Sequence, residues 1–268
     1  MSEPTPLVAR LRGEGILNAQ AGGKGSSLDV LVSLGANVPT TSVITTEAYR
    51  LFVSDPALSA FLDELRDGDL PEPEDHEREQ ERVDAAFLDV DLPDPILEAI
   101  AAEAPPVGGG ATLAVRSSAT AEDTASASFA GQYRSYLGVG PDDLSSAVRL
   151  VWSSLWHPAP RSYRRFRDIP ETDLSMAVVL MAMLEPSHAG VIFTTDPGGE
   201  ADQLRLEVVE GLGEALVSGE ATPDAYVVPR EGAAEELGRV DPVLGELVVE
   251  ALRIEEELGK PQDIEWAI

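Results

Sequence analysis

The sequence lacks cysteine, long apolar runs and almost all lysine. None of its 268 residues is a cysteine, and Lys24 and Lys260 are the only lysines among 19 basic residues. Without cysteine there is no disulfide framework and no thiolate metal site. No segment approaches the roughly 18 apolar residues of a membrane-spanning helix, and the N-terminal stretch MSEPTPLVARLRGEG lacks the apolar region of a secretory signal. We therefore expect a cytoplasmic protein with no membrane partner.

Acidic residues dominate the charge. The chain has 48 Asp and Glu against 19 Lys and Arg, which gives a formal net charge of −29. A field of this sign repels nucleic acids and anionic membranes, so we expect neither as a partner. Two origins fit this acidic protein: a proteome adapted to high salt, or a coding bias that favours arginine over lysine. Because lysine is almost excluded, Lys24 between glycines is an informative exception.

The stretch AGGKGSS (21–27) has the composition of a phosphate-binding loop but not its common spacings. A P-loop needs a glycine where Asn18 stands and a serine or threonine where Gly25 stands. The dinucleotide-binding pattern GxGxxG needs its third glycine where Leu28 stands. The residue types therefore indicate phosphate binding, while both familiar motifs are excluded.

A helix is expected directly after this stretch. Apolar residues recur at helical spacing over 26–35, where Ser26 or Ser27 can cap the start and Gly35 the end. The unpaired N–H groups at the start of such a helix favour anions. The position of the glycine-lysine loop therefore supports phosphate binding.

Strands and helices alternate along the rest of the chain. Apolar runs predict strands at 112–116, 177–184, 190–197, 205–213, 224–228 and 261–268. Helical spacing predicts helices at 144–156, 159–167 and 241–258. A short strand within 42–49 is expected to lead into a helix near 47–53. The alternation predicts an α/β or α+β fold.

Five segments resemble one protein family and occur in that family's order. They are GGKGSSL (22–28), AVRSSATAED with SFAGQY (114–133), AGVIFTTDP (189–197), GLGEALVSG (211–219) and PQDIEW (261–266). Together they are similar to the nucleotide-binding domain of the phosphoenolpyruvate synthase and pyruvate phosphate dikinase family, which includes rifampin phosphotransferase. The resemblance implies an ATP-grasp-like fold with ATP in the cleft between two α/β lobes, expected here at 1–176 and 177–268.

The resemblance also implies a set of phosphate-binding residues. Lys24 and Arg116 match the family's catalytic cations on the ATP phosphates, a role that suits a mobile ammonium and a planar guanidinium. Gly131 matches its phosphate-side glycine loop, and Ser135 stands where the family often has threonine. Other interpretations remain open: a surface lysine, a plain turn at Gly131, and a structural ion pair of Arg116 with Glu122 or Asp123.

Adenine and metal sites are implied in the second half of the chain. Met181, Met183 and Glu185 match the segment that lies along the adenine, although many relatives have glutamine where Met181 stands. Simple core packing of the two methionines is the alternative. Glu265 in QDIEW matches a magnesium-binding glutamate, and a carboxylate suits Mg²⁺; a surface carboxylate on an edge strand is the alternative.

The combined expectation is an ATP-binding module of a phosphoenolpyruvate-synthase-like phosphotransferase. ATP and Mg²⁺ are its expected cofactors. The module is expected to pass a phosphoryl group to a histidine on a separate phosphohistidine domain, either a partner protein or C-terminal domains outside this sequence, and so to be incomplete alone. The family's Gln-x-Arg-Pro strand, which supplies a further metal ligand and an arginine, has no counterpart here.

Two other functions remain open. They are the ATP-binding part of a rifampin-type antibiotic phosphotransferase and a nucleotide-binding module without catalysis.

None of the three histidines matches a catalytic motif. His76 lies in a charged segment over 63–82 that is expected to be partly helical. We expect structural or surface roles for His76, His157 and His188.

The net charge of −29 predicts that salt stabilises the protein. Self-repulsion is screened over about 10 Å in 0.1 M salt and about 3 Å in 1 M salt. The melting temperature is therefore expected to rise between 0.1 and 1 M KCl. A flat melting temperature over this range would support the coding-bias origin of the acidity instead.

Overall fold

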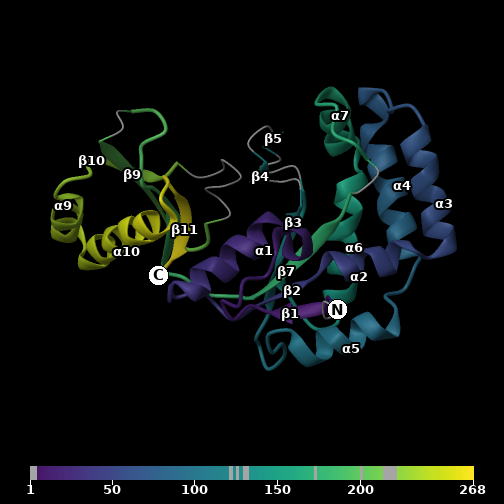
Figure 1. Cartoon of the computed structure of the whole chain (residues 1–268), viewed down its shortest axis with the longest axis horizontal. Coiled ribbons are helices and arrows are strands. Elements are labelled where there is room, and N and C mark those ends of the chain that lie inside the picture. Colours follow the sequence, from purple (N-terminus) through teal and green to yellow (C-terminus); the bar gives the residue numbers. More distant parts are fainter. Residues whose placement is uncertain are drawn as a thin grey trace. The chain divides into compact units, whose positions relative to one another are not determined.

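The chain divides into two compact units. In the computed structural model the described residues are 5–120, 123–124, 127–128, 133–171, 174–199, 202–213 and 222–268. The first unit is Met1–Met183 and the second is Leu184–Ile268 (Figure 1). Within the described residues no helix has the length and apolar character needed to cross a membrane.

The first unit is built on a five-stranded sheet with antiparallel neighbours. Its strand order is β1 (Val8–Arg10), β2 (Thr41–Ile44), β7 (Met176–Ala182), β3 (Leu113–Ala119) and β6 (Ser135–Val139). A separate two-stranded ribbon joins β4 (Asp123–Thr124) to β5 (Ala127–Ser128). The predicted strands at 112–116 and 177–184 are therefore present as β3 and β7, with shifted ends.

Strand β7 belongs to the first unit, whereas the predicted domain division assigns it to the second lobe. The boundary expected between 176 and 177 would place this strand in the second lobe. Instead β7 lies at the centre of the first sheet, because it pairs with β2 on one side and β3 on the other. Its first five residues are buried, so its continuous apolar sequence reflects helices on both faces of the sheet.

Helices cover the two faces of this sheet unequally. One face carries α1 (Asn18–Ser33) over a small core that includes Val43 and Val179. The opposite face carries the larger core, which includes Val178 and Leu180. The other helices of this unit are α2 (Thr46–Val53), α3 (Pro56–Asp67), η1 (Pro73–Asp75), α4 (His76–Leu88), α5 (Asp94–Glu103), α6 (Leu144–Ser153), η2 (Ser154–Trp156) and α7 (Pro158–Phe166). The two-residue side-chain period of β7 divides its apolar residues between these two cores.

In its described residues, the second unit packs two helices on a four-stranded antiparallel sheet. Its strand order is β10 (Asp224–Pro229), β9 (Gln203–Glu210), β8 (His188–Phe193) and β11 (Asp263–Ala267). The helices are α9 (Ala233–Val240) and α10 (Pro242–Leu258). Helix α10 begins as its sequence predicts, with Asp241 accepting a hydrogen bond from the Val243 N–H at 2.9 Å. It ends at Gly259 in the left-handed conformation.

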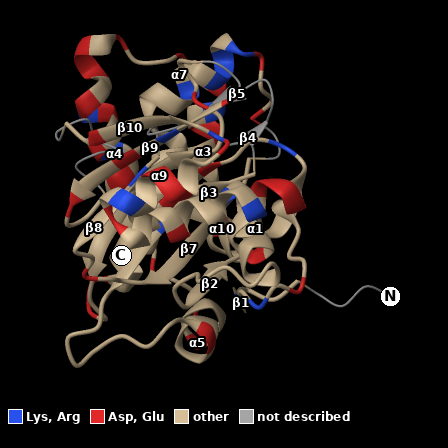
Figure 2. Ribbon diagram, turned by 90° about the vertical axis from the view of Figure 1, so that its left-hand side faces the viewer, with Lys and Arg blue, Asp and Glu red and all other residues tan. Residues whose placement is uncertain are grey.

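The helix-and-sheet architecture is consistent with the predicted α/β (α+β) class. The helices expected at 144–156, 159–167 and 241–258 are present, the first ending as a 3-10 turn. Helices α5 and α9 were not predicted. Acidic residues lie along several helices of the first unit, including α4 and α5 (Figure 2), so much of the charge of −29 is on helix surfaces.

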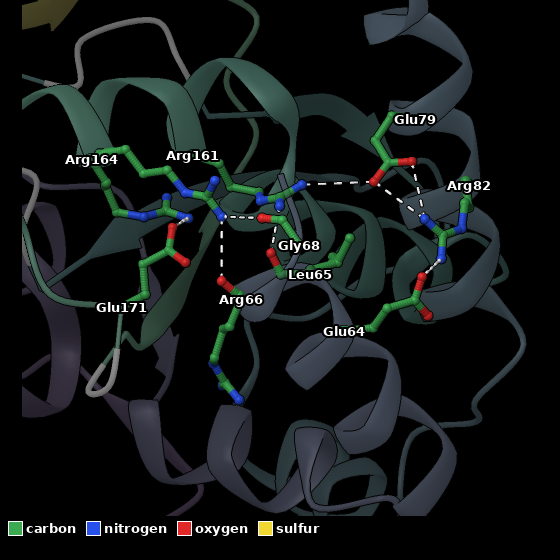
Figure 3. A network of polar contacts seen from close by, with 10 residues as sticks. Glu64, Leu65, Arg66, Gly68, Glu79, Arg82, Arg161, Arg164 and Glu171 are labelled. Atoms are coloured by element: carbon green, nitrogen blue, oxygen red, sulfur yellow. Dashed lines mark hydrogen bonds and ion pairs between the residues drawn. The ribbon is translucent and has the colours of Figure 1, made fainter. Parts of the chain in front are cut away.

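Two arginines of α7 are buried in the helical part of the first unit. Arg161 is 1% exposed and Arg164 is fully buried. Arg164 donates to the Leu155 carbonyl at 2.8 Å. It also lies 3.5 Å from Glu171 (Figure 3). Arg161 donates to the Leu65 carbonyl at 2.5 Å. Each cation therefore joins α7 to another segment. Arg161 bonds a carbonyl in the last turn of α3, and Arg164 bonds a carbonyl of η2.

Removing the carboxylate of a buried ion pair should lower the free energy of unfolding more than removing the carboxylate of an exposed ion pair. Glu171→Ala leaves Arg164 buried without its carboxylate, and we expect a loss of about 3 kcal/mol in the free energy of unfolding. The surface pair of Arg239 with Glu235 is 2.5 Å long with side chains 71% and 76% exposed, so Glu235→Ala should change stability by less than about 0.5 kcal/mol.

Urea unfolding of the two variants tests this contrast. The double variant Arg164→Met with Glu171→Ala should recover most of the loss, since it removes the buried charge as well. Equal effects of Glu171→Ala and Glu235→Ala would show that the Arg164 pair is not desolvated in solution.

Candidate functional site

Helix α1 is broken at Gly22. This residue has φ 67° and ψ 179°, so α1 consists of two helical segments joined at a kink. A Cβ atom at this position would collide with the carbonyl oxygen of Ser118 on β3. Both the positive φ and the close approach therefore require glycine.

The glycine-lysine stretch is helical after this break, which corrects the prediction of a loop through Gly25. The second helical segment starts just after Gly22, so Lys24 lies in its first turn. Ser26 does not cap the helix; its hydroxyl donates to the carbonyls of Gly22 and Gly23 at 2.9 and 3.0 Å. The predicted end is correct, since Gly35 follows the helix with φ 75°.

Ser118 connects β3 to both sides of the break. Its hydroxyl donates to the Ala21 carbonyl at 2.6 Å and accepts from the Gly25 N–H at 3.0 Å. The side chain is fully buried. The strand therefore holds the helix break directly, through one side chain that the sequence analysis did not single out.

Strand register gathers several predicted residues on the face of the sheet that α1 covers. Residues directly opposite each other in antiparallel strands project to the same face. Arg116 lies opposite Val179 on β7 and opposite Ser135 on β6. Val179 is part of the small core beneath α1. Arg116 and Ser135 therefore share the α1 face, and Lys24 is on α1 itself.

Arg116 has an unusual place in its strand. Every other residue of β3 is buried, while Arg116 is partly exposed. Ser135, its neighbour on β6, is exposed. Gly131 and Glu122 lie outside the described residues. The first unit therefore carries Arg116 and Ser135 on the sheet face that α1 covers, with Lys24 on that helix.

The predicted adenine residues lie at and beyond the end of β7. Met181 packs against the small core beneath α1, as the core-packing alternative expects. The backbone N–H of Met183 donates to the Thr112 carbonyl at 3.0 Å, which ties the chain to the start of β3. Glu185 is exposed and belongs to the second unit.

Asp29 anchors the segment that precedes α1. Its carboxylate is 2% exposed and accepts four backbone N–H groups at 2.8 to 3.1 Å, from Arg12, Gly13, Gly15 and Ile16. Burial raises the pKa of Asp29, but these hydrogen bonds together outweigh it and hold the pKa below the ordinary value of 3.8. The sequence signal for this role is that Asp29 is a charged residue on the packed side of the helix predicted over 26–35.

Glu265 lies on the sheet of the second unit. It is exposed on β11, opposite Val191 of β8. Glu207 of β9 is also opposite Val191, so both glutamates share one face, away from the core residues Ile192 and Leu206. Glu207 was not predicted; it also pairs with Arg205 at 2.7 Å. Among the described residues no group of three or more His, Cys, Asp or Glu could hold a metal ion.

The histidines occupy the structural or surface positions that were expected. His157 is 5% exposed, and its Nε2 lies 2.8 Å from the Asp84 carboxylate. Burial raises the pKa of Asp84, but hydrogen bonds from His157 and Ser153, with charge attraction to His157 and Arg134, lower it overall. His76 begins α4, and His188 is exposed on β8.

Asp29→Asn should destabilise the protein at neutral pH. The amide presents its own N–H groups to backbone donors, so we expect a loss of about 3 kcal/mol in the free energy of unfolding at pH 7. Because the folded pKa is below the unfolded one, the stabilisation by Asp29 is present above about pH 4 and is lost as the pH falls through the folded value.

Urea unfolding at pH 7 and pH 3 measures this effect. The difference between wild type and Asp29→Asn should shrink at pH 3. Asp142→Asn, the same change in an exposed turn, is the matched control and should have little effect at either pH. A difference that stays constant with pH would exclude an ionised Asp29 as the source of stability.

Comparison with known proteins agrees with the motifs. Residues 18–241 match the family described as pyruvate phosphate dikinase, AMP/ATP-binding domain. A phosphoenolpyruvate synthase of Aeropyrum pernix is 30% identical over 92% of this chain and 38% of its own length. A rifampicin phosphotransferase of Streptomyces sviceus is 34% identical over 93% of this chain and 33% of its own length.

A third relative has a name that refers to a different activity. The prodigiosin synthesizing transferase PigC of Serratia marcescens is 37% identical over 84% of this chain and 24% of its own length. The chain thus spans less than half the length of each of these relatives. The match over residues 18–241 nevertheless includes most of the chain, which therefore belongs to the pyruvate phosphate dikinase AMP/ATP-binding domain family.

Proposed function

We propose that this chain is the Mg·ATP-binding module of a phosphoenolpyruvate-synthase-like phosphotransferase. One observation carries the proposal: in a member of an AMP/ATP-binding family, strand register puts Arg116 on the sheet face covered by the helix that bears Lys24. In this proposal Lys24 and Arg116 neutralise the β- and γ-phosphates. The module has the ATP-grasp-like fold that its motifs imply.

The local chemistry near Gly22 suits a triphosphate. The second segment of α1 starts there, and a helix N-terminus carries about half a positive charge. Lysine provides a compact charge for a phosphate oxygen, and arginine provides a planar pair of donors. Backbone groups near Gly131 would add N–H donors. Ser135 on the neighbouring strand would add a hydroxyl.

The proposed metal contacts come from the second unit, and the proposed adenine contacts come from the segment 181–185. Mg²⁺ usually takes one or two carboxylates together with phosphate oxygens and water. Glu265, with Glu207 on the same sheet face, fits that donor set without a larger cluster. Bound Mg²⁺ supplies charge that offsets the phosphate oxygens. Backbone groups near Met183 and Glu185 would contact adenine.

The phosphoryl acceptor in this proposal is a histidine outside this chain. The relatives are more than twice as long as the part that the chain matches, which leaves room for further domains. His157 is poorly suited to accept a phosphoryl group because it is enclosed and paired with Asp84. The antibiotic-modifying alternative is supported by the 34% identity to a rifampicin phosphotransferase and needs the same ATP module.

Arg116→Ala should weaken binding of Mg·ATP by about 1.5–3 kcal/mol, the scale of hydrogen bonds to a charged group. This corresponds to a rise of roughly 10- to 150-fold in Kd. Isothermal titration calorimetry of the purified chain with Mg·ATP measures the effect. Lys24→Ala should act in the same direction.

Arg50→Ala is the matched control, because it removes the same charge from an exposed side chain that pairs with Glu47. It should leave the Kd almost unchanged. Equal affinities of wild type, Arg116→Ala and Lys24→Ala would remove both cations from the site. No binding by the wild type would contradict the proposed function itself.

A further inference from the structure

The break in α1 interrupts one particular helical hydrogen bond. In a continuous α-helix the N–H of residue 25 donates to the carbonyl of residue 21. Here both groups bond to the Ser118 hydroxyl instead, which donates to the Ala21 carbonyl at 2.6 Å and accepts from the Gly25 N–H at 3.0 Å. A side chain from β3 is therefore inserted into the hydrogen-bond ladder of the helix, a recognised cause of kinks.

The insertion is tightly enclosed. Ser118 and Ala21 have no exposed surface, and Gly25 is also buried. A Cβ atom at Gly25 would lie 2.9 Å from the Ala21 Cβ and 3.1 Å from the Val43 Cγ2. Water therefore has little access to replace the hydroxyl. Loss of the hydroxyl would leave a buried donor and a buried acceptor unsatisfied.

The Ser118 hydroxyl joins the helix turn that carries Lys24 to the strand that carries Arg116. Lys24 immediately precedes Gly25, whose N–H the hydroxyl binds. Arg116 lies two residues before Ser118 on the same face of β3, because side chains alternate along a strand. We propose that Ser118 is a positioning residue that holds the Lys24 turn of α1 in register with Arg116. This inference rests on the proposed function, since it assigns those two cations to one triphosphate.

The physical role of Ser118 is pre-organisation. A flexible lysine binds a phosphate oxygen well only if its backbone is held at the right distance from the other phosphate ligands. Without the hydroxyl, the Ala21 carbonyl and the Gly25 N–H would be drawn toward a direct helical bond. That movement would straighten the break and shift Lys24 relative to Arg116.

Ser118→Ala should raise the Kd for Mg·ATP about tenfold. This is the scale of one hydrogen bond between a displaced Lys24 and a phosphate oxygen. Ser117→Ala is the matched control, because Ser117 is the adjacent buried serine and projects to the opposite face of β3. It can lower the melting temperature, but the Kd should stay within about twofold. Isothermal titration calorimetry and thermal unfolding of both variants separate affinity from stability.

A double-mutant cycle tests whether Ser118 acts through Lys24. If it does, Ser118→Ala should change the Kd much less in a Lys24→Ala background than in the wild type. Ser118→Cys, which keeps the shape of the side chain but has a larger sulfur that hydrogen-bonds weakly, replaces Ser118→Ala if the alanine variant does not fold. It should weaken binding several-fold in the same pattern.

The outcomes are distinct. Additive effects of Ser118→Ala and Lys24→Ala, or an unchanged Kd in Ser118→Ala and Ser118→Cys, would overturn the positioning role while leaving the ATP proposal intact. Wild-type protein that does not bind Mg·ATP would overturn the proposed function and this inference with it.

Discussion

The backbone contact between α1 and β3 at Gly22 is the constraint on which the first unit's candidate site depends. A side chain at this position would collide with the Ser118 carbonyl, so the helix reaches the strand only because glycine is present. That approach lets the Ser118 hydroxyl enter the helical ladder. It also creates a new helix N-terminus beside Lys24, in the interior of α1.

Antiparallel register then determines which side chains share the space near that terminus. The pairing of Arg116 with Val179 and Ser135 places them on the α1 face, while Val115, Leu180 and Tyr136 next to them pack in or against the larger core. A shift of one residue in β3 would turn Arg116 into that core. The same alternation in the second unit turns Glu265 away from the helices and Ile264 toward them.

Local patterns predicted much of this structure, and long-range contacts account for what they missed. Apolar runs identified β3 and β7, and the glycines around Lys24 marked a segment that proves to contain a break in α1. The break at Gly22 was missed because it depends on Ser118, nearly a hundred positions away. The role of Asp29 was missed because its partners lie in an irregular segment that has no periodic pattern. The compact units divide after Met183, beyond β7, and the sequence does not reveal this because β7 reads as a strand without revealing its neighbours.

The acidic charge of −29 and an anionic nucleotide are compatible because the two act over different distances. At physiological ionic strength the field of distant carboxylates is screened within about 8 Å. In the proposed site, contacts with Lys24, Arg116 and the helix terminus would act at hydrogen-bonding distance, where screening is weak. An acidic surface would therefore slow the approach of ATP to the proposed site more than it would weaken the bound state. On the proposed function, the close contacts that order the Lys24 turn would determine affinity, which would make the buried hydroxyl of Ser118 as relevant to binding as the cations themselves.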